Sequence, residues 1–481
     1  MKTFFLIIGL CTARRVLWTS CGLISTISFG QAVTVQLDTA LKRLETDAQF
    51  KHAILSMYVV DSKTGKVVFD KNAQIGLAPA SCQKVVTSVS AFEMLGKGYS
   101  YKTDLAFDGT ITNNILTGNI YLVGYGDPTL GSWRWTNTNE KLVLNTLVSA
   151  IQKKGIKQVD GNVFGYDRKW ESNNTPRGWI WEDIGNYYGA GASSLNWREN
   201  QYDIILRAGE KIGDKATIEK IIPPLENVGF YSEVITAKKG SGDNAYIYLA
   251  PYGMSGYVRG TIPLGETNFK ISGAMPNAAE QLTITFANEL KSKDIGGILF
   301  TGSYNGMEVE KKDIPIYPAI ISTIISPTLD SINYWFLKKS VNLYGEAFVK
   351  TIAYEKTKFG STDTGIAIIK DFWSNNGIEK PALNIIDGSG LSPANRVTTN
   401  ALVTILQYAK QQQWFTSFYN ALPEINGIKM KDGYINGVRS YTGYVKSKSG
   451  AEYTFSFIVN NFDGSPGTVR EKMWKVLDIL K

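Results

Sequence analysis

Residues 77–84 read Leu-Ala-Pro-Ala-Ser-Cys-Gln-Lys, and this stretch decides how the rest of the chain is interpreted. Pro79 favours a helix start, and the pattern from Ser81 to Leu95 predicts a helix. Because Ser81 and Lys84 are three residues apart, such a helix places the hydroxyl and the amine on one face. A lysine whose pKa is lowered by desolvation or by a positive neighbour can act as the base for a serine nucleophile. By itself the Ser-x-x-Lys spacing is a weak signal, because many helices carry it by accident.

The histidine and cysteine counts exclude most other hydrolytic sites. The 481-residue chain has one histidine, His52, and three cysteines. A Ser-His-Asp triad would have to use His52, which starts an alternating, strand-like segment and is predicted to be structural. Cys11 and Cys21 lie in the N-terminal segment described below, so only Cys82 would remain in the mature chain and no intramolecular disulfide could form. Zinc sites built from cysteine and histidine are excluded, and we predict neither a metal nor a cofactor.

Two later motifs could complete the site. In Ser340-Val341-Asn342, the serine could relay a proton to the leaving group, and the asparagine could hold the substrate's peptide bond or fix Lys84. The alternative is an ordinary helix cap. In Lys431-Asp432-Gly433, the lysine could attract an anionic substrate end, and the glycine would let the backbone approach the substrate closely. The alternative for this segment is a solvated turn.

The N-terminal segment differs from the rest of the chain. Residues 1–32 contain Lys2, Arg14 and Arg15, no acidic residue, and two apolar stretches at 4–10 and 16–29. Neither stretch reaches the about 20 residues of a membrane-spanning helix, so we predict a secretory signal peptide, with a short membrane anchor as the alternative. Its removal lowers the net charge from +8 to about +5, which suits an anionic polymer such as a bacterial wall. No dense block of basic and aromatic residues indicates nucleic-acid binding.

The hydrophobic patterns divide the chain into α/β ends and a β-rich middle. Near the N-terminus, a helical pattern at 33–50 precedes strand patterns at 53–60 and 66–70. From residue 101 to about 300, short alternating segments separated by Gly and Asn turns predict strands, with helices near 140–154 and 278–293. The last third predicts a strand pair at 437–461 and helices at 329–356, 364–375, 397–413 and 468–480. These patterns favour one α/β domain interrupted by a long β-rich insert.

Together the three motifs form the Ser-x-x-Lys, Ser-x-Asn and Lys-Thr-Gly combination of penicillin-binding proteins and β-lactamases. Four longer blocks add to it: Pro-Ala-Ser-Cys-Gln-Lys at 79–84, Gly-Tyr-Gly-Asp-Pro-Thr-Leu at 124–130, Asp-Gly-Ser-Gly-Leu-Ser at 387–392 and Gly-Val-Arg-Ser-Tyr-Thr-Gly-Tyr at 437–444. In this order they resemble the class C low-molecular-mass penicillin-binding proteins, the D-alanyl-D-alanine carboxypeptidase/endopeptidase family. The roughly 255 residues between Lys84 and Ser340 are similar to the large insert of that family. The resemblance extends over nearly all of the mature chain.

The resemblance implies an α/β (α+β) fold, a serine-transpeptidase or β-lactamase-like domain with a long β-rich two-domain insert. The expected units are a signal peptide at 1–32, a discontinuous penicillin-binding peptidase domain at 33–97 and 310–481, a β-rich insert domain at 98–195 and 276–309, and a nested smaller insert domain at 196–275. The protein is expected to be exported to the periplasm.

The implied activity is hydrolysis of peptidoglycan stem peptides or crosslinks between two D-residues, through an acyl-enzyme on Ser81. Lys84 would take the hydroxyl proton. The backbone amides of Ser81 and of Gly433–Ile435 would stabilise the oxyanion, with Tyr434 in the same substrate-binding strand. Penicillin and other β-lactams would acylate the same serine and stay bound.

The segment 179–190 also resembles the family. Here Asp183 and Tyr188 match positions that line the pocket for the diamino-acid side chain of the stem peptide. A carboxylate suits a free substrate ammonium. A packed surface loop is the alternative for both residues.

One residue departs from the family's pattern. The third motif of the family has Thr or Ser after its lysine, and here Asp432 stands in that place. A carboxylate at contact distance from the substrate's terminal carboxylate repels it by about 1 kcal/mol in water and by several at lower dielectric. Either Asp432 points away, or a cation such as Lys431 neutralises it, or the substrate's carboxylate binds more weakly. The segment Lys448-Ser449-Gly450 fits the motif literally but falls in a predicted hairpin turn, so Lys431 is the favoured lysine.

Two other functions stay open at this point. One is a catalytically weak wall-binding homologue that lost turnover through Asp432. The other is a β-lactamase-like esterase or amidase that acts on D-amino acids with the same Ser-Lys pair, although the long insert favours the peptidase. The sequence does not predict the preference for terminal D-Ala or crosslinks, a loose membrane association, the oligomeric state or the signal cleavage site.

Overall fold

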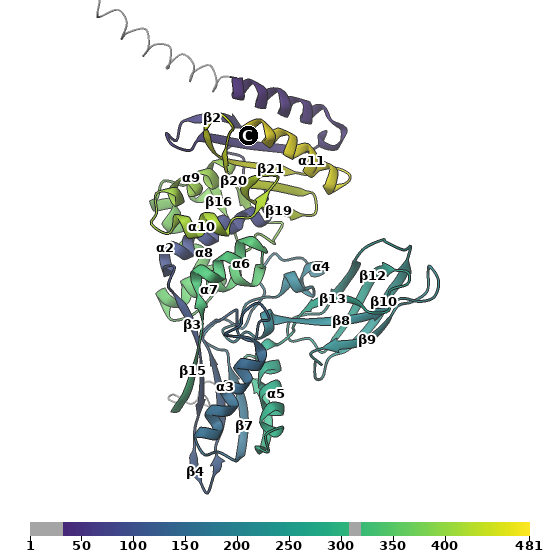
Figure 1. The fold of residues 1–481 in the computed structure, drawn as a ribbon, viewed down its shortest axis with the longest axis vertical. Helices are drawn as coiled ribbons and strands as arrows, with labels where there is room; N and C mark the ends of the chain where they lie inside the picture. Colours follow the sequence, from purple (N-terminus) through teal and green to yellow (C-terminus); the bar gives the residue numbers. More distant parts are fainter. Residues whose placement is uncertain (1–31, 307–318) are drawn as a thin grey trace, which may run out of the picture.

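The computed structural model describes residues 32–306 and 319–481 of the chain (Figure 1). The predicted signal peptide, residues 1–32, lies outside the described residues apart from its last position, and so do Cys11 and Cys21. In the two described ranges, no helix has both the length and the apolar character that crossing a membrane requires.

The two ends of the chain form one six-stranded sheet, in the order β18-β19-β20-β21-β1-β2. Its strands are β1 Ile54–Asp61, β2 Val67–Lys71, β18 Glu424–Ile425, β19 Ile428–Ile435, β20 Val438–Lys446 and β21 Glu452–Asn460. β1 pairs with β21 in antiparallel register, from Ile54 opposite Asn460 to Asp61 opposite Tyr453. This pairing joins segments roughly 400 residues apart, so the sheet unites the N-terminal and C-terminal parts of the chain.

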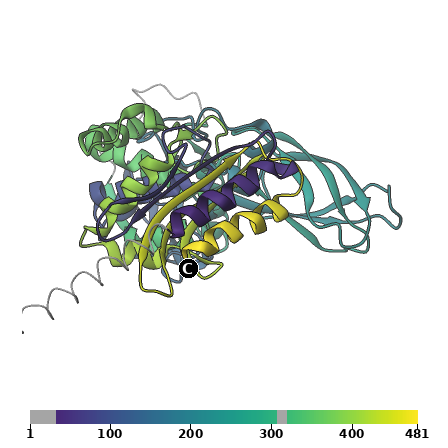
Figure 2. The ribbon, with the colours of Figure 1, turned by 90° about the horizontal axis from the view of Figure 1, so that it is seen from above.

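Helices cover both faces of this sheet. On one face, the helix at 32–46 lies beside α11 (Pro466–Leu477), as Figure 2 shows. Their apolar side chains pack on the sheet in a buried cluster that includes Leu37, Met57 and Met473. On the other face, α9 (Thr399–Lys410) packs against β1 and β21, and α2 (Lys84–Leu95) packs on α9.

The second helical layer surrounds α2 and consists of α6 Leu329–Lys338, α7 Asn342–Thr357, α8 Thr362–Asn375 and α10 Phe415–Ala421. The sequence predicted one continuous helix at 329–356, and this prediction was wrong. The chain breaks between α6 and α7, where Ser340 has a left-handed φ of +56°. A residue in this conformation cannot continue a right-handed helix. Both α6 and α7 contact α2, so the break brings the Ser340-Val341-Asn342 motif to the side of the Ser81 helix.

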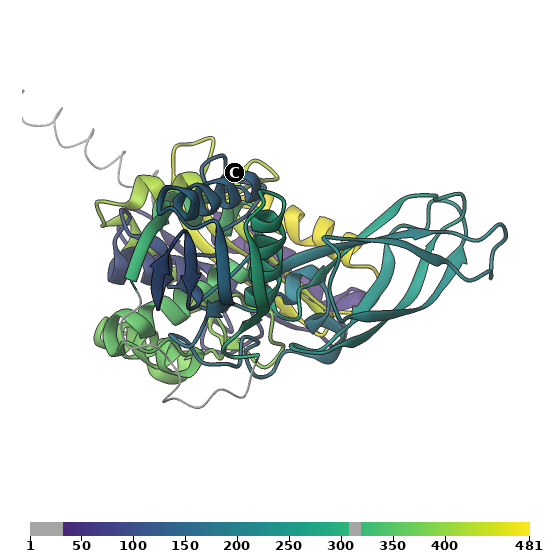
Figure 3. The same cartoon turned by 90° about the horizontal axis from the view of Figure 1, so that it is seen from below.

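Between α2 and α6 the chain forms a β-rich unit (Figure 3). Its seven-stranded sheet has the order β15-β3-β6-β7-β5-β4, with β14 beside β7. The strands are β3 Ser100–Phe107, β4 Thr110–Thr112, β5 Ile115–Thr117, β6 Ile120–Gly124, β7 Gln158–Tyr166, β14 Gly296–Ser303 and β15 Ala319–Thr328. The helices α3 (Glu140–Lys153) and α5 (Ala278–Lys291) pack on this sheet and on each other.

Two small sheets project sideways from this unit as an arm (Figures 1 and 3). Their strand orders are β10-β12-β11 and β13-β8-β9. The strands are β8 Gln201–Arg207, β9 Thr217–Ile222, β10 Gly229–Ala237, β11 Asn244–Tyr248, β12 Ser255–Pro263 and β13 Phe269–Ala274. The domain boundaries expected from the sequence stay a prediction.

Candidate active site

Ser81 lies in a short 3-10 turn, η2 (Ala80–Gln83), that leads directly into α2. The residue before it, Ala80, is buried and has a left-handed φ of +45°. A non-glycine residue in this conformation costs of order 1–3 kcal/mol and persists only where its surroundings enforce it. One such contact is the Ser440 hydroxyl, which donates to Pro79 O over 2.6 Å. Backbone strain is thus stored directly beside Ser81, as is typical of functional sites.

Lys84 is completely buried, and its amine is held in one position. Its Nζ donates to Ser81 Oγ at 2.8 Å, to Asn342 Oδ1 at 2.6 Å and to Ser389 O at 2.8 Å. These bonds use all three donors of an ammonium group. A neutral amine would keep two donors and turn its lone pair toward the third partner, so a proton can pass between Ser81 and Lys84 within one hydrogen bond.

The surroundings of Lys84 favour its neutral form. Burial, followed by the positive charge of Lys431, lowers the pKa of Lys84 to about 7, against the opposing effect of Asp387 and Glu346. Glu346 is itself buried, and burial together with the charge of Asp387 raises the pKa of its carboxyl group. Near neutral pH a substantial fraction of Lys84 is therefore unprotonated, as a general base requires.

Asn342 is the first residue of α7. Its side-chain oxygen accepts from Lys84, and its Nδ2 donates to Tyr188 O at 2.8 Å. The helix-cap alternative does not apply, because Val341 occupies the cap position and makes no side-chain cap bond. Ser340 lies two residues earlier and is not among the three partners of Lys84 Nζ. The structure therefore brings Asn342, but not Ser340, into hydrogen-bond contact with Lys84.

Lys431 and Asp432 lie on β19, which packs against η2. Lys431 is only 1% exposed, so this segment is not the solvated turn of the alternative interpretation. Its Nζ donates to Asp432 Oδ1 at 2.9 Å and to Asp432 O at 2.6 Å. Burial alone would raise the pKa of Asp432, but the charge and hydrogen bond of Lys431 and the charge of Arg439 hold it below its usual range. Asp432 is therefore an ion-paired carboxylate. The competing Lys448 lies in the exposed turn between β20 and β21.

Gly433 allows β19 to approach the Ser81 turn closely. A Cβ at this position would lie 2.4 Å from Ser440 Oγ, 2.7 Å from Pro79 O and 2.9 Å from Ser81 N. Any side chain would thus push the strand away from the nitrogen of Ser81. The next residue, Tyr434, is 48% exposed beside this contact. Gly433 therefore brings the backbone of β19 close to the backbone nitrogen of Ser81.

Asp183 and Tyr188 lie in and just after the short helix α4 (Trp181–Ile184), and both are partly buried. Burial and the charge of Glu182 raise the pKa of Asp183 to about 6, while a hydrogen bond from the Tyr188 side chain opposes the rise. The carbonyl of Tyr188 is the group that Asn342 holds. These contacts connect the 183–188 segment to the Lys84 group.

The sequence marked the block at 387–392 but assigned no role to its residues. In the structure it belongs to the loop between β16 (Leu383–Asn384) and β17 (Arg396–Val397). Asp387 is buried and accepts from Gln83 Nε2 at 2.9 Å and from Trp179 Nε1 at 3.0 Å. Gly390 has a φ of +82°, and a Cβ there would lie 2.0 Å from Ala80 O. The loop therefore supports both the Ser81 turn and, through the Ser389 carbonyl, Lys84.

Neither His52 nor Cys82 is among the hydrogen-bond partners of Lys84 Nζ. His52 lies exposed in the turn before β1. The Cys82 thiol is buried, donates to Lys431 O at 3.3 Å, and has its pKa raised by burial to about 12. Across the parts of the chain that the structure describes, no cluster of acidic, histidine or cysteine side chains could hold a metal ion.

Comparison with known proteins gives one family. The sequence pattern of the D-Ala-D-Ala carboxypeptidase 3 (S13) family matches residues 37–478. A D-alanyl-D-alanine carboxypeptidase of Actinomadura sp. is 26% identical over 459 residues, which cover 87% of this chain and 80% of that protein. The D-alanyl-D-alanine carboxypeptidase DacB of Haemophilus influenzae is 22% identical over 429 residues, 85% of each chain.

A solved structure with the same fold is penicillin binding protein 4 (dacB) from Haemophilus influenzae. It superposes with a TM-score of 0.74 at 20% identity, over 89% of this chain and 96% of that one. The same protein in complex with a β-lactam gives a TM-score of 0.69. The superposition confirms the fold class predicted from the sequence.

Proposed function

Because the chain belongs to the D-Ala-D-Ala carboxypeptidase 3 (S13) family, we propose that it is a serine carboxypeptidase or endopeptidase of peptidoglycan stem peptides, with Ser81 as nucleophile. The observation that carries this proposal is the 2.8 Å contact between Lys84 Nζ and Ser81 Oγ in a buried setting. A desolvated amine with a pKa of about 7 beside a serine hydroxyl is the arrangement of an activated nucleophile.

The proposed reaction has two halves. The neutral amine of Lys84 takes the Ser81 proton while Oγ attacks the carbonyl carbon between two D-residues. The amides of Ser81 and Gly433–Ile435 stabilise the oxyanion, and the C–N bond breaks as the Lys84 proton passes through the Ser340 hydroxyl to the leaving amine. Water then attacks the ester with Lys84 as base again. This step releases the shortened peptide as an acid and restores the Ser81 hydroxyl.

The remaining site residues would hold the substrate. Lys431 would attract the terminal carboxylate, and Asn342 would hold the peptide bond next to the scissile one. Asp183, supported by Tyr188, would bind the ammonium of a diamino-acid side chain. Both Tyr434 and Asp432 would contact the substrate from β19.

The test of this proposal is covalent labelling by penicillin. Purified protein incubated with a fluorescent penicillin should form a stable adduct, and mass spectrometry of its fragments should place that adduct on Ser81. Digestion of purified peptidoglycan with product analysis should then release D-Ala, cut crosslinks, or both. An adduct on another residue, or no adduct and no product, would rule out the peptidase.

The same experiment separates the two alternatives. A wall-binding homologue without turnover would bind peptidoglycan and release nothing. A β-lactamase-like hydrolase would release hydrolysed penicillin rapidly instead of retaining it. Neither is favoured, since the relatives in the same family are D-alanyl-D-alanine carboxypeptidases.

We further propose that residues 1–32 direct export to the periplasm and are then removed. The basic start and the apolar stretches of this segment support the proposal. N-terminal sequencing of the protein from a periplasmic fraction should give a start near residue 33. Retention of Met1 in a cytoplasmic fraction would contradict it.

Acylation by penicillin should rise with pH through about 7. Lys84 must be unprotonated to accept the Ser81 proton, and burial together with Lys431 holds the pKa of Lys84 at about 7. Below this pKa the neutral fraction falls about tenfold per pH unit, so the acylation rate at pH 5 should be about 100-fold below its plateau. Stopped-flow measurement between pH 5 and 9 checks this. A flat profile across that range would show that Lys84 is not the base.

Replacing Asp432 with threonine should raise kcat/KM on a peptide ending in D-Ala-D-Ala by about five- to tenfold. The substitution removes a like charge from the carboxylate-binding strand and frees Lys431 from its ion pair. Asp432→Asn removes the charge without supplying a hydroxyl and is the matched control. A peptide amidated at its C-terminus has no carboxylate to repel and should show no gain. An unchanged or reduced rate on the free acid would mean that Asp432 does not oppose the substrate.

A further inference from the structure

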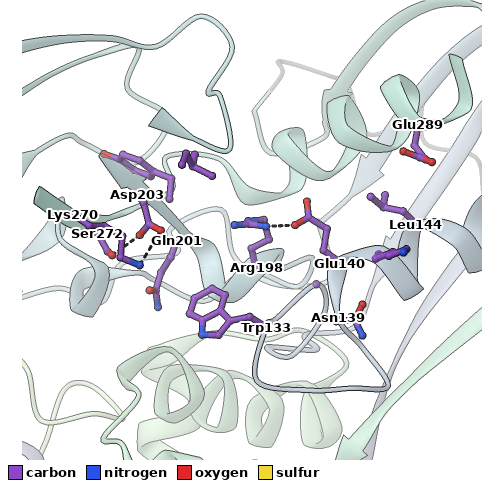
Figure 4. Close-up of a pocket in the computed structure, with 14 residues that line it drawn as sticks. Trp133, Asn139, Glu140, Leu144, Arg198, Gln201, Asp203, Lys270, Ser272 and Glu289 are labelled. Carbon is purple, nitrogen blue, oxygen red and sulfur yellow. Dashed lines mark hydrogen bonds and ion pairs between the residues drawn. The ribbon is translucent and has the colours of Figure 1, made fainter. Parts of the chain in front are cut away.

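The molecule also has a pocket of about 660 Å³, which Figure 4 shows in close-up. It is called here the Trp133 pocket. Its walls come from residues 131–144, from residues 198–203 at the base of the arm, from strands β9 and β13, and from Glu289 on α5. Its volume falls within the about 300–1,000 Å³ of small-molecule sites. None of its residues belongs to the site described above.

The charges of the Trp133 pocket cancel one another. Its lining holds as many acidic as basic side chains. Arg198 is ion-paired with Glu140, and Lys270 with Asp203 at 3.2 Å (Figure 4). Ser272 Oγ also donates to Asp203 at 2.6 Å. A pocket with this balance offers no excess charge to an anionic or cationic ligand but many fixed hydrogen-bonding groups.

Trp133 supplies an exposed aromatic surface in the same pocket. Its side chain is 54% exposed, and the Arg134 guanidinium lies 5.6 Å from the ring centre. Figure 4 shows the indole extending from its loop toward the side of Gln201 and Arg198. An indole face beside amide, hydroxyl and carboxylate groups matches a saccharide, since a sugar ring has an apolar C–H face and a rim of hydroxyls.

One wall of the pocket, at residues 198–200, has a strained backbone. Arg198, Glu199 and Asn200 are three successive non-glycine residues with positive φ, between +52° and +54°. Each such residue costs of order 1–3 kcal/mol, and strain of this kind is typical of functional sites. Glu199 holds the segment: it is buried and accepts from Ser132 Oγ at 2.7 Å and from Arg134 Nε at 2.8 Å. The backbone that carries Arg198 and Gln201 is therefore held in place by contacts within the protein.

This wall is tied to the helix that carries Asn342. Tyr344 Oη donates to Glu199 Oε1 at 2.8 Å, and Tyr344 is two residues after Asn342 on α7. We propose that the Trp133 pocket binds a neutral saccharide, the sugar strand of the wall polymer whose stem peptides reach Ser81. The identity of the polymer rests on the proposed function; the saccharide chemistry rests on the pocket alone. The hydrogen bond between Tyr344 and Glu199 connects the pocket wall to α7. A sugar strand bound in the pocket would therefore lie at a fixed position relative to the Ser81 site.

The experiment is a calorimetric titration of the mature Ser81→Ala protein with a neutral β-1,4-linked N-acetylglucosamine tetramer. Because this protein cannot form an acyl-enzyme, the result does not depend on the chemistry at Ser81. We expect saturable binding that Trp133→Ala and, separately, Gln201→Ala weaken by at least about tenfold. Tyr231→Ala is the matched control: Tyr231 is 68% exposed on β10, outside the pocket, and its loss should leave binding unchanged.

Three outcomes would overturn the saccharide site. They are no saturable binding to the Ser81→Ala protein, equal binding by the Trp133→Ala variant, and tighter binding of an anionic polymer such as polyphosphate that about 0.3 M salt abolishes. Thermal unfolding of each variant checks that it is folded. A failed penicillin label with intact tetramer binding would overturn the peptidase and leave the saccharide site standing.

Discussion

The Ser81→Ala variant should lose all covalent labelling by penicillin, and its hydrolysis of peptides ending in D-Ala-D-Ala should fall by about 10⁴-fold or more. A methyl side chain cannot form the acyl bond, and no nearby hydroxyl can replace it. Ser340 lacks the direct contact with Lys84 that Ser81 has in the free protein, and its proposed role is to relay a proton, so it would not replace Ser81 as the nucleophile. Gel fluorescence after penicillin labelling and release of D-Ala from a soluble peptide measure the two effects.

The loss should come from chemistry and not from unfolding. In the Ser81→Ala variant, Lys84 keeps its bonds to Asn342 and to the Ser389 carbonyl. One hydrogen bond is worth about 1 kcal/mol, so the midpoint of thermal unfolding should shift by no more than about 2–4 °C. A folded Ser81→Ala protein that still acquires a penicillin adduct would disprove the assignment of the nucleophile.

The Lys84→Met variant should lose acylation by about 10²–10⁴-fold while remaining about as stable as the native protein. Burying the lysine lowers its pKa from 10.5 to about 7, which costs roughly 4–5 kcal/mol near neutral pH. Methionine has similar length and no such cost. In the variant, Asn342 Oδ1 and the Ser389 carbonyl no longer accept a hydrogen bond from Lys84. This loss costs about 1–3 kcal/mol for each of the two acceptors left without a partner. The two effects nearly offset each other.

The pH dependence of stability tests whether Lys84→Met stays stable because it removes the cost of burying the lysine. Since the folded state lowers the pKa of Lys84, the unfolded chain binds more protons between about pH 7 and pH 10.5. The native protein therefore gains stability relative to Lys84→Met as the pH rises through that window. Unfolding midpoints of both proteins at pH 7 and 10 measure the gain. An identical difference at the two pH values would mean that Lys84 is not desolvated.

Lys84→Arg is the matched control for charge. A guanidinium stays protonated in proteins, so this variant keeps a cation but has no basic form. It should be as inactive as Lys84→Met and clearly less stable, because the buried charge cannot be neutralised. Acylation within tenfold of the native rate in either variant would remove Lys84 from the mechanism.

Local patterns predicted many of the elements. The helix after Ser81 and the strand pair at 437–461 follow from periodicity and turn residues alone, and α2, β20 and β21 lie there. The prediction of a single helix at 329–356 was wrong because the hydrophobic periodicity is nearly continuous from α6 into α7. Ser340 adopts its left-handed backbone where α6 and α7 both pack on α2, and a one-dimensional pattern does not contain those contacts.

Sequence motifs indicated the candidate site residues, but they did not predict the contacts among these residues. The sequence left open whether Asp432 repels substrate, turns away or is neutralised, and its ion pair with Lys431 is a contact of the folded strand. It gave no role to Asp387, whose partners Gln83 and Trp179 lie 304 and 208 residues away. The sequence did not predict the Trp133 pocket, because its walls come from segments that are separate along the chain.

The proximity of the proposed reactive pair, Ser81 and Lys84, was determined by sequence, because a helix brings residues three apart onto one face whatever surrounds it. The state of that pair was decided by tertiary structure. The groups that hold and desolvate Lys84 include Asn342 and Ser389, which are 258 and 305 residues away along the chain. A lysine in water keeps its proton at neutral pH. Only the packing of these distant segments removes the water and lowers the pKa of the same side chain, as the proposed role of base requires.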